Sequence, residues 1–354
     1  MSGISIDILG QTVQADFAAV YKTRADLAAI TAAAGDVAFL AEPGREGNFI
    51  YKADNLSAAV SSDTLQGLYL APAVSPTGSA GAWVRVWDQI NGYPEWFYSG
   101  DWANAIEACY KLCPVTLLGR KDYYFTRTIK LNTPWRTVRG QGGVAYDGNQ
   151  GTRLVFGSGS GDAMQVGPDA NPGGNPGVTF LRGVQLDNFQ LTRGATLVPA
   201  SSIAASPTGL RCQFLYDCDI DVYSFESSVG CQIKGCVFSR ISCTYERAAS
   251  AITNINDVSI GTYIDTTTNI GLAGGNASLT IRALSSIPNT TSPTRIGVYA
   301  YGMLADTIFD YCETVGGATG MLLKATGTAA NNVDIRLIIP TLDQPANRPT
   351  GVWC

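Results

Sequence analysis

Hydrophobic residues in this chain are grouped in short runs of strand length, separated by turns rich in Gly, Pro and Ser. The first group of runs covers residues 37–40, 48–52, 67–70 and 82–87. Short β-prone runs bounded by such turns are typical of strands joined by tight connections. The pattern therefore predicts a compact β module in the first third of the chain.

Two short segments have helical patterns instead. Thr23, with Asp26 three residues later, has the pattern of a helix N-cap with an acidic residue in the first turn, so a helix is expected as far as about Ala34. Asp101 is placed to cap a second, Ala-rich helix that must end at Pro114, because proline cannot continue a helix. This second helix is expected to cover the open end of the domain that follows.

Beyond Pro114 the sequence repeats. A shift of 21 residues superimposes apolar on apolar positions, and a shift of 23 does the same nearer the C-terminus. The superimposed pairs are Leu210 on Cys231, Cys212 on Ile233, Ile220 on Ile241, Val222 on Cys243, Val298 on Met321, Ala300 on Leu323 and Tyr301 on Lys324. Stacked coils with one face inward and one outward require such a register, and the variable coil length favours a β-helix over a leucine-rich repeat.

Coils of roughly 21 to 27 residues predict about nine coils at about 4.8 Å each. The divisions expected along the chain are an extended N-terminal arm (1–22), a small α+β module (23–95), a linker with the capping helix (96–114), a parallel β-helix (115–345) and a C-terminal tail (346–354).

Composition narrows the class of function. Charged residues make up 15% of the chain, the net charge is −5, and no Lys/Arg cluster offers a footprint for phosphates, so nucleic acid is not an expected partner. No apolar stretch has the length of a membrane span, and the first residues lack the basic start of a signal peptide. We expect a soluble protein made in a cytoplasm.

The chain contains no histidine. This excludes a Ser-His-Asp triad, a Cys-His dyad and most catalytic zinc sites. Any chemistry must come from Asp, Glu, Lys, Arg or Tyr, which favours glycoside hydrolase or lyase mechanisms. The segment Asp217-Cys218-Asp219 matches no standard metal-ligand spacing, so neither a metal nor a cofactor is predicted.

An acidic cluster offers the candidate catalytic residues, Asp219, Asp221, Glu226 and Glu246. Alternate residues of a strand share the outer face, and adjacent coils bring their side chains within about 5 Å. The same register places Asp219 beside Arg240, and Glu226 beside Arg247, so ladders of ion pairs explain the cluster without catalysis. Both interpretations stay open here.

Outward-facing aromatic residues give a second set of candidates, Tyr223, Tyr299 and Tyr301. A ring face stacks on a sugar while neighbouring polar groups bind its hydroxyls. The alternative is that several copies of the rod pack side by side and bury these rings. Tyr223 shares the face of the acidic cluster, whereas Tyr299 and Tyr301 lie on the face of Lys324.

The nine cysteines cannot all pair within one chain. Cys212, Cys231 and Cys243 share columns with aliphatic residues and are expected to be buried and reduced. Cys109, Cys113 and the terminal Cys354 are the expected accessible thiols. Of these, Cys354 is the candidate for an intermolecular disulfide, and a free thiol on a frayed tail is the alternative.

Three stretches carry a resemblance to a known family: Gly44-Arg45-Glu46-Gly47-Asn48-Phe49 with Gly67-Leu68-Tyr69-Leu70-Ala71-Pro72, Gly81-Ala82-Trp83-Val84-Arg85, and Trp96-Phe97 ahead of Asp101. In this order they resemble the N-terminal module and β-helix start of bacteriophage tailspikes of the pectate-lyase-like superfamily. The resemblance covers roughly residues 20–145. It implies a mostly β protein with a right-handed, single-stranded parallel β-helix, a homotrimer, and attachment to other virion proteins through the N-terminal region.

The resemblance also implies binding or cleavage of bacterial surface polysaccharide. Two departures from the family argue against that activity: the segment before the capping helix lacks the usual paired acidic residues, and only about ten residues follow the last expected strand, too few for a C-terminal receptor-binding or clamping domain. The second departure is the main argument for a purely architectural protein. The leading hypothesis is thus an adhesive virion spike assembled in the host cytoplasm. A polysaccharide depolymerase, or a purely architectural capsid or collar protein, are the alternatives.

Overall fold

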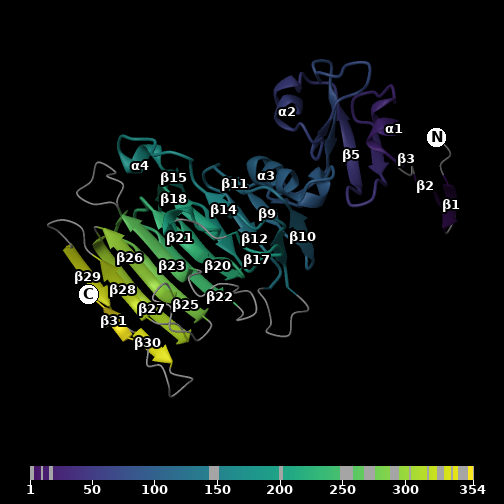
Figure 1. Ribbon diagram of the computed structural model, residues 1–354. Helices are drawn as coiled ribbons and strands as arrows, with labels where there is room; N and C mark the ends of the chain where they lie inside the picture. Colours follow the sequence, from purple (N-terminus) through teal and green to yellow (C-terminus); the bar gives the residue numbers. More distant parts are fainter. Residues whose placement is uncertain are drawn as a thin grey trace. The chain divides into compact units, whose positions relative to one another are not determined.

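The chain folds into two compact units, Met1–Cys113 and Pro114–Cys354 (Figure 1). The computed structural model describes residues 4–8, 11–15, 19–142, 151–198, 202–247, 258–266, 276–287, 295–302, 304–316, 319–324, 331–335, 338–341 and 350–353.

A five-stranded sheet in the order β3-β4-β5-β7-β6 organises the first unit. Its strands are β3 (Ala19–Tyr21), β4 (Val37–Leu40), β5 (Gly47–Lys52), β6 (Tyr69–Leu70) and β7 (Ala82–Arg85). Alternate residues of these strands face a core in which Leu40, Phe49 and Trp83 are at most 2% exposed. The four strand runs predicted between residues 37 and 87 are therefore confirmed, each as one strand.

The predicted helices are also present, the first one shorter than expected. In α1 (Arg24–Ala28), Thr23 and Asp26 form a reciprocal capping box. The helix ends at Ala28 rather than near Ala34, because the Asp36 carboxylate accepts the Ala33 N–H at 2.8 Å and turns the chain before the next strand. In α3 (Trp102–Leu112), the Asp101 side chain accepts the Ala103 N–H at 2.9 Å, as the sequence predicts.

Other elements of this unit were not predicted. The expected extended arm contains a hairpin, in which β1 (Ile4–Ile8) pairs with β2 (Gln11–Ala15) in antiparallel fashion. The short elements α2 (Ser57–Ser62), β8 (Asn91–Gly92) and the 3-10 turn η1 (Pro94–Phe97) are also present. The first of these begins where the Asn55 side chain accepts the Ser57 N–H at 3.1 Å, a local turn without hydrophobic periodicity.

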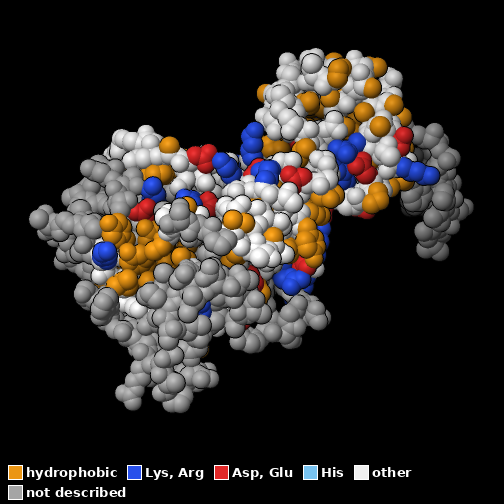
Figure 2. All heavy atoms as spheres, viewed as in Figure 1, with side chains coloured by type: hydrophobic (Ala, Val, Ile, Leu, Met, Phe, Trp, Pro, Cys, Tyr) orange, Lys and Arg blue, Asp and Glu red, His pale blue; other side chains and the backbone are white. Residues whose placement is uncertain are grey.

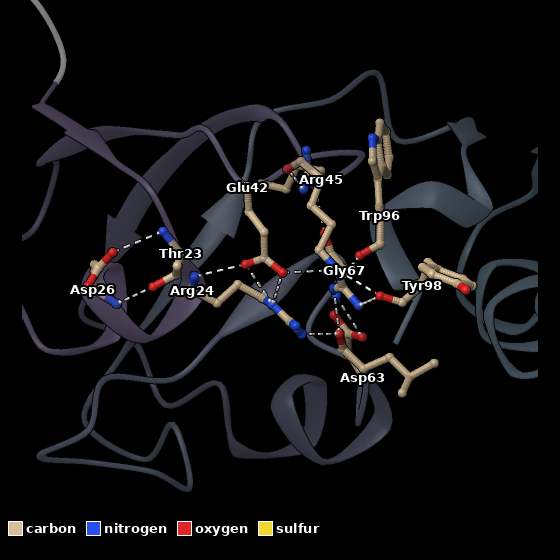
Figure 3. Close-up of polar contacts among 11 residues, drawn as sticks. Thr23, Arg24, Asp26, Glu42, Arg45, Asp63, Gly67, Trp96 and Tyr98 are labelled. Atoms are coloured by element: carbon tan, nitrogen blue, oxygen red, sulfur yellow. Dashed lines mark hydrogen bonds and ion pairs between the residues drawn. The ribbon is translucent and has the colours of Figure 1, made fainter. Parts of the chain in front are cut away.

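Two buried arginines, Arg45 and Arg85, hold the connections of this unit together, and Figure 3 shows the contacts of Arg45. The Arg45 guanidinium is 2% exposed and donates to the carbonyls of Leu65, Trp96 and Tyr98. The Arg85 guanidinium donates to the carbonyls of Gly67, Glu46 and Arg45. A guanidinium presents five N–H donors in a fixed fork, so each arginine satisfies several loop carbonyls at once. This explains why both arginines stand inside the motifs quoted above.

The second unit is a parallel β-helix, the mostly β architecture that the repeats predict. One sheet, here called the wide sheet, stacks β9 (Val115–Leu117), β12 (Thr137–Arg139), β16 (Gln185–Asp187), β20 (Asp219–Phe225), β22 (Arg240–Glu246), β25 (Thr280–Ile287) and β27 (Leu304–Gly316). A row of strands joins it at the longer strand β20, namely β10 (Asp122–Phe125), β13 (Arg153–Phe156) and β17 (Gln190–Arg193).

An eight-stranded sheet closes the other side of the β-helix (Figure 1). Its strands are β11 (Ile129–Leu131), β14 (Asp162–Val166), β18 (Thr208–Gln213), β21 (Val229–Lys234), β23 (Ser259–Thr266), β26 (Arg295–Gly302), β28 (Thr319–Lys324) and β31 (Thr350–Trp353). The shorter elements are α4 (Pro176–Thr179), β15 (Leu181–Arg182), η2 (Ile203–Ala205), β19 (Leu215–Tyr216), β24 (Asn276–Ala277), β29 (Asn331–Ile335) and β30 (Ile338–Thr341).

The predicted register is confirmed at every pair in the repeats. Leu210 lies beside Cys231 and Ile220 beside Ile241, and the second repeat places Val298 beside Met321. The inward positions Leu210, Cys212, Ile220, Val222, Cys231, Ile233, Ile241 and Cys243 are all at most 2% exposed. Burial of these side chains stabilises the packing of each coil on the next.

Coil length is less regular than expected. Leu210 pairs with Cys231 after 21 residues, but Met164 pairs with Leu210 after 46, because α4 and its flanking turns leave the stack between them. The prediction of 21 to 27 residues for every coil is therefore wrong. The number of strands in the eight-stranded sheet, within the described residues, is close to the prediction of about nine coils.

Candidate functional site

The outer face of the wide sheet carries a groove with a volume of about 410 Å³. It runs across β13, β17, β20, β22, β25 and β27, and its lining is Arg153, Gln190, Thr192, Tyr223, Phe225, Thr244, Tyr245, Glu246, Leu284, Ser285, Ser286, Glu313 and Val315. Most of these residues occupy outward positions that alternate with the buried core positions of the same strands. The groove is thus built by residues that the fold leaves free to vary.

Tyr223 and Glu246 meet in this groove from adjacent coils. Phe225 is the backbone neighbour of Glu246, so Tyr223 stands diagonally across from the carboxylate, and its hydroxyl donates to Glu246 Oε2. The hydrogen bond holds the phenol ring in place and orients the carboxylate toward the groove. These are two of the residues predicted from the sequence.

A second carboxylate, Glu313, lies on β27. Its Oε2 accepts the Tyr311 hydroxyl at 2.8 Å, and this hydrogen bond raises the pKa of Tyr311. Only β25 separates β22 from β27 in the sheet, and Glu313 stands two residues before Val315, the residue in line with Glu246. The backbones of Glu246 and Glu313 are therefore roughly 12 Å apart. The groove therefore contains two carboxylates within side-chain reach of one bound ring system.

Two further polar groups complete the lining. Gln190 is 4% exposed, and within the described part of the chain no donor reaches its Oε1. A buried acceptor without a donor costs on the order of 1 to 3 kcal/mol, so a ligand hydroxyl that donates to it gains that amount. Arg153 donates from Nε to Asp122 at 2.6 Å and lowers the pKa of that carboxyl through this hydrogen bond.

The other predicted acidic residues lie away from this groove. Asp219 accepts the Arg240 Nε–H at 2.8 Å in the ion pair that the register predicts. Asp221 is exposed on the outer face of β20, and Glu226 follows the strand with a positive φ of 59°. The structure thus brings together Tyr223 and Glu246 from the predicted set and leaves the other acids outside.

Tyr299 and Tyr301 lie on β26 in the eight-stranded sheet. Tyr299 is 9% exposed and stacks on Tyr263 with ring centroids 5.4 Å apart, so it offers little ring area to a sugar. Tyr301 has Lys324 Nζ 5.8 Å from its ring centroid. Around them the outward side chains Val229, Ile260, Tyr263, Ile296 and Tyr299 form one cluster, and Figure 2 shows hydrophobic side chains gathered over β23 and β26.

Cysteine accessibility differs from expectation. Cys109 and Cys113 are both fully buried, because they face a core formed with Leu68 and Phe97 rather than solvent. All eight cysteines of the described residues are free thiols, and Cys354 lies outside those residues. Burial raises the pKa of Cys218 to about 11 and that of Cys236 to about 12.

Glu313, Gln190 and Phe225 are groove residues that the sequence analysis missed. Phe225 shares the parity of Tyr223 and could have been found from the period-21 register. Glu313 could not, because the pairing of β25 with β27 shifts between Ile281 and Arg282, and a fixed shift then places β27 in the wrong register.

Among the described residues, no group of three or more Cys, Asp or Glu side chains is arranged to hold a metal ion. Nor does any helix in the described ranges combine the length and the apolar character needed to cross a membrane.

Neither a protein-family model nor a curated protein matches the sequence. Solved structures do match the fold. The tailspike gp42 of Acinetobacter phage vb_AbaP_AS12 superimposes with a TM-score of 0.57 at 13% identity, over 90% of this chain and 57% of that one. The β-helix is tailspike-like.

Two weaker matches are also phage tailspikes. Tailspike protein 2 of Escherichia coli O157:H7 bacteriophage CAB120 gives a TM-score of 0.45 at 13% identity, over 90% of this chain and 50% of that one. Tailspike gp49 of Acinetobacter baumannii bacteriophage Fri1, described as a capsular polysaccharide depolymerase, gives 0.42 at 10% identity, over 94% and 77%. The chain spans 57% of the length of the first tailspike and 50% of the second.

Proposed function

We propose that this protein is a virion spike of a tailed bacteriophage that binds polysaccharide on the surface of its host through the groove on the wide sheet. The observation that carries the proposal is the combination of side chains in one groove: the rings of Tyr223 and Phe225, the carboxylates of Glu246 and Glu313, and the unsatisfied oxygen of Gln190. Aromatic faces stack on the apolar faces of sugars, while carboxylate and amide oxygens accept their hydroxyls. The tailspike-like fold supports the same proposal.

Assembly is the second part of the proposal. The first unit has its own sheet and its own core of buried residues, which suits an attachment module that joins the spike to other virion proteins. The partly exposed side chains of Tyr301 and Leu322, which pack against the apolar cluster on the eight-stranded sheet, suit a contact between the three copies of a homotrimer. We propose that the spike is assembled in the host cytoplasm and acts as part of the virion.

Binding is tested with capsular polysaccharides and lipopolysaccharide O chains immobilised as an array. The full chain is expected to bind a subset, and Tyr223→Ala and Glu246→Gln each to weaken binding to that subset. Glu107→Gln on α3 is the matched control, since it removes one carboxylate far outside the groove residues in sequence. Array binding unaffected by both groove variants would mean that another surface holds the glycan.

Cleavage is a second candidate function, because Glu246 and Glu313 face the same groove. Two carboxylates around one glycosidic bond are what a glycoside hydrolase needs, one as acid and the other as base or nucleophile. Incubation with a polysaccharide that binds, followed by measurement of chain length, tests this. Shortening that disappears in both Glu246→Gln and Glu313→Gln supports cleavage in the groove, and ultraviolet absorbance of an unsaturated product distinguishes a lyase from a hydrolase.

A further inference from the structure

One corner of the β-helix is built from a column of residues with left-handed backbones. Five of them stand two positions before a strand of the wide sheet, and Asp306 stands within β27, two positions before Ile308, the partner of Thr280. The strand segments that follow these positions pair in register from coil to coil. The column consists of Trp135 (φ 57°), Gly183 (φ 61°), Asp217 (φ 55°), Phe238 (φ 49°), Ser278 (φ 53°) and Asp306 (φ 47°). The corner itself therefore requires the positive φ, which Gly, Asn and Asp adopt at the lowest cost.

Trp135 and Phe238 are unfavourable residues for the backbone conformation of this column. A bulky side chain at positive φ is strained, and burial usually compensates such strain. Here Trp135 and Phe238 are 61% and 55% exposed as whole residues. A Cβ on Gly183 would lie 2.1 Å from Trp135 Cε3, so the indole lies against the backbone of the next coil and presents its other face outward.

A pocket of about 410 Å³, distinct from the groove, lies between the two rings. Three coil spacings separate Trp135 from Phe238, which is roughly 14 Å along the stack. The polar side chains between them are Gln185, Asp217, Asp219 and Arg240. Asp219 and Arg240 hold each other in a two-point ion pair, so both donors and acceptors have fixed positions in this corner pocket.

We propose that the corner pocket is a second saccharide-binding site, which takes a segment of two or three sugar residues of the polysaccharide held in the groove. Its rings stack on sugars at the two ends, and the ion pair and Gln185 bind hydroxyls between them. This rests on the proposed function for the identity of the ligand, but the site shares no residue with the groove. When one polymer binds at both sites, its binding at the first site raises its effective concentration at the second, so its overall affinity increases.

Substitution of the two aromatic residues by asparagine distinguishes a role in ligand binding from a role in folding. Trp135→Asn and Phe238→Asn remove the rings and suit a left-handed backbone, so the melting temperature of the full chain should stay the same or rise. Affinity of the double variant for the polymer should fall on the order of tenfold or more, while affinity for a single repeating unit at the groove is unchanged. A drop in melting temperature with unchanged polymer affinity would show that the rings serve packing, and would overturn the proposal.

Fluorine NMR of the full chain labelled with 5-fluorotryptophan observes the pocket directly, with the Trp135 resonance assigned by Trp135→Phe. Addition of the best-binding array polysaccharide should shift that resonance, and should still do so in Tyr223→Ala, which would support the corner pocket even if the groove proved wrong. A Trp135 resonance unmoved at saturation would overturn the corner pocket alone. Absence of binding by any polysaccharide would overturn both sites, and a change of oligomeric state in the Asn double variant would make this corner a contact between copies.

Discussion

The Tyr223 hydroxyl donates to Glu246 Oε2 across one coil boundary, and both side chains line the groove. If the ring stacks on a sugar, its face matters more than its hydroxyl. Tyr223→Ala should then reduce polysaccharide affinity about tenfold, since an aromatic contact is worth about 0.5 to 1.5 kcal/mol beyond its area. Tyr223→Phe should reduce affinity only a few-fold. Isothermal titration of both variants measures this, and equal losses would assign the effect to the hydrogen bond instead.

The charge of the groove predicts which polysaccharides bind. Its lining has two carboxylates, Glu246 and Glu313, and one guanidinium, Arg153, which is engaged by Asp122. An acidic polysaccharide should therefore bind more weakly than the same polymer after chemical reduction of its uronic acids. Because salt screens like-charge repulsion, affinity for the acidic form should rise between low and physiological ionic strength. A titration in which that affinity falls with added salt would contradict the prediction.

The interior register predicts a sharp contrast between neighbouring residues of β20. Ile220 is 0% exposed, so Ile220→Ala should lower the free energy of unfolding of the β-helix by about 2 to 5 kcal/mol. Asp221 points outward, and Asp221→Ala should change it by less than about 0.5 kcal/mol. Denaturant unfolding followed by circular dichroism compares the two. Similar losses for both would mean that inward and outward positions are misassigned.

Sequence alone located this core because the coils around Ile220 are short. Where consecutive coils differ by whole loops, as between Met164 and Leu210, no fixed shift aligns them and only the paired backbone reveals the register. For the same reason, the sequence predicted only part of the groove. Tyr223 and Glu246 lie within the regular coils, whereas Glu313 lies beyond the irregular pairing of β25 with β27.

Thiol exposure depended on tertiary contacts that periodicity does not encode. Cys109 lies on α3 and Cys113 is the C-cap residue one turn later, and nothing in that spacing shows which face of the helix is covered. The structure places both against Leu68 and Phe97. In the same way, the sequence identified Arg45 and Arg85 only as members of the motifs and did not predict their hydrogen bonds. Their acceptors are backbone carbonyls, which every residue has, so no side-chain pattern marks them.

Buried thiols predict slow modification of the native protein. Burial raises the pKa values of Cys218 and Cys236 to about 11 and 12, so few thiolates exist at pH 8. A thiol reagent at pH 8 should therefore modify the Cys354→Ser variant only after unfolding. For Cys354 itself, our proposal of an intermolecular disulfide predicts a crosslinked band on non-reducing electrophoresis of mature particles. A monomer band unchanged by Cys354→Ser would end that proposal.

A column of glycines fixes how closely the two sheets approach. Gly209, Gly230, Gly261 and Gly297 occupy matching positions in successive coils, and a Cβ on Gly261 would lie 1.9 Å from Ser285 Oγ and 2.6 Å from the Gly297 carbonyl oxygen. Because the second of these atoms is backbone, the neighbouring coil must move. Gly261→Ala should lower the free energy of unfolding by about 1 to 3 kcal/mol.

Gly157→Ala is the matched control for this change. Its Cβ would meet Phe125 O at 3.4 Å, an ordinary contact, and its backbone is not left-handed. Alanine lowers the conformational entropy of the unfolded chain, so Gly157→Ala should leave the free energy of unfolding unchanged or raise it by about 0.4 to 1 kcal/mol. Ser285→Gly in the Gly261→Ala background removes one of the two clashes and should recover part of the loss. Denaturant unfolding of the four proteins measures these differences, and a Gly261→Ala variant as stable as Gly157→Ala would show that the sheets can separate without cost.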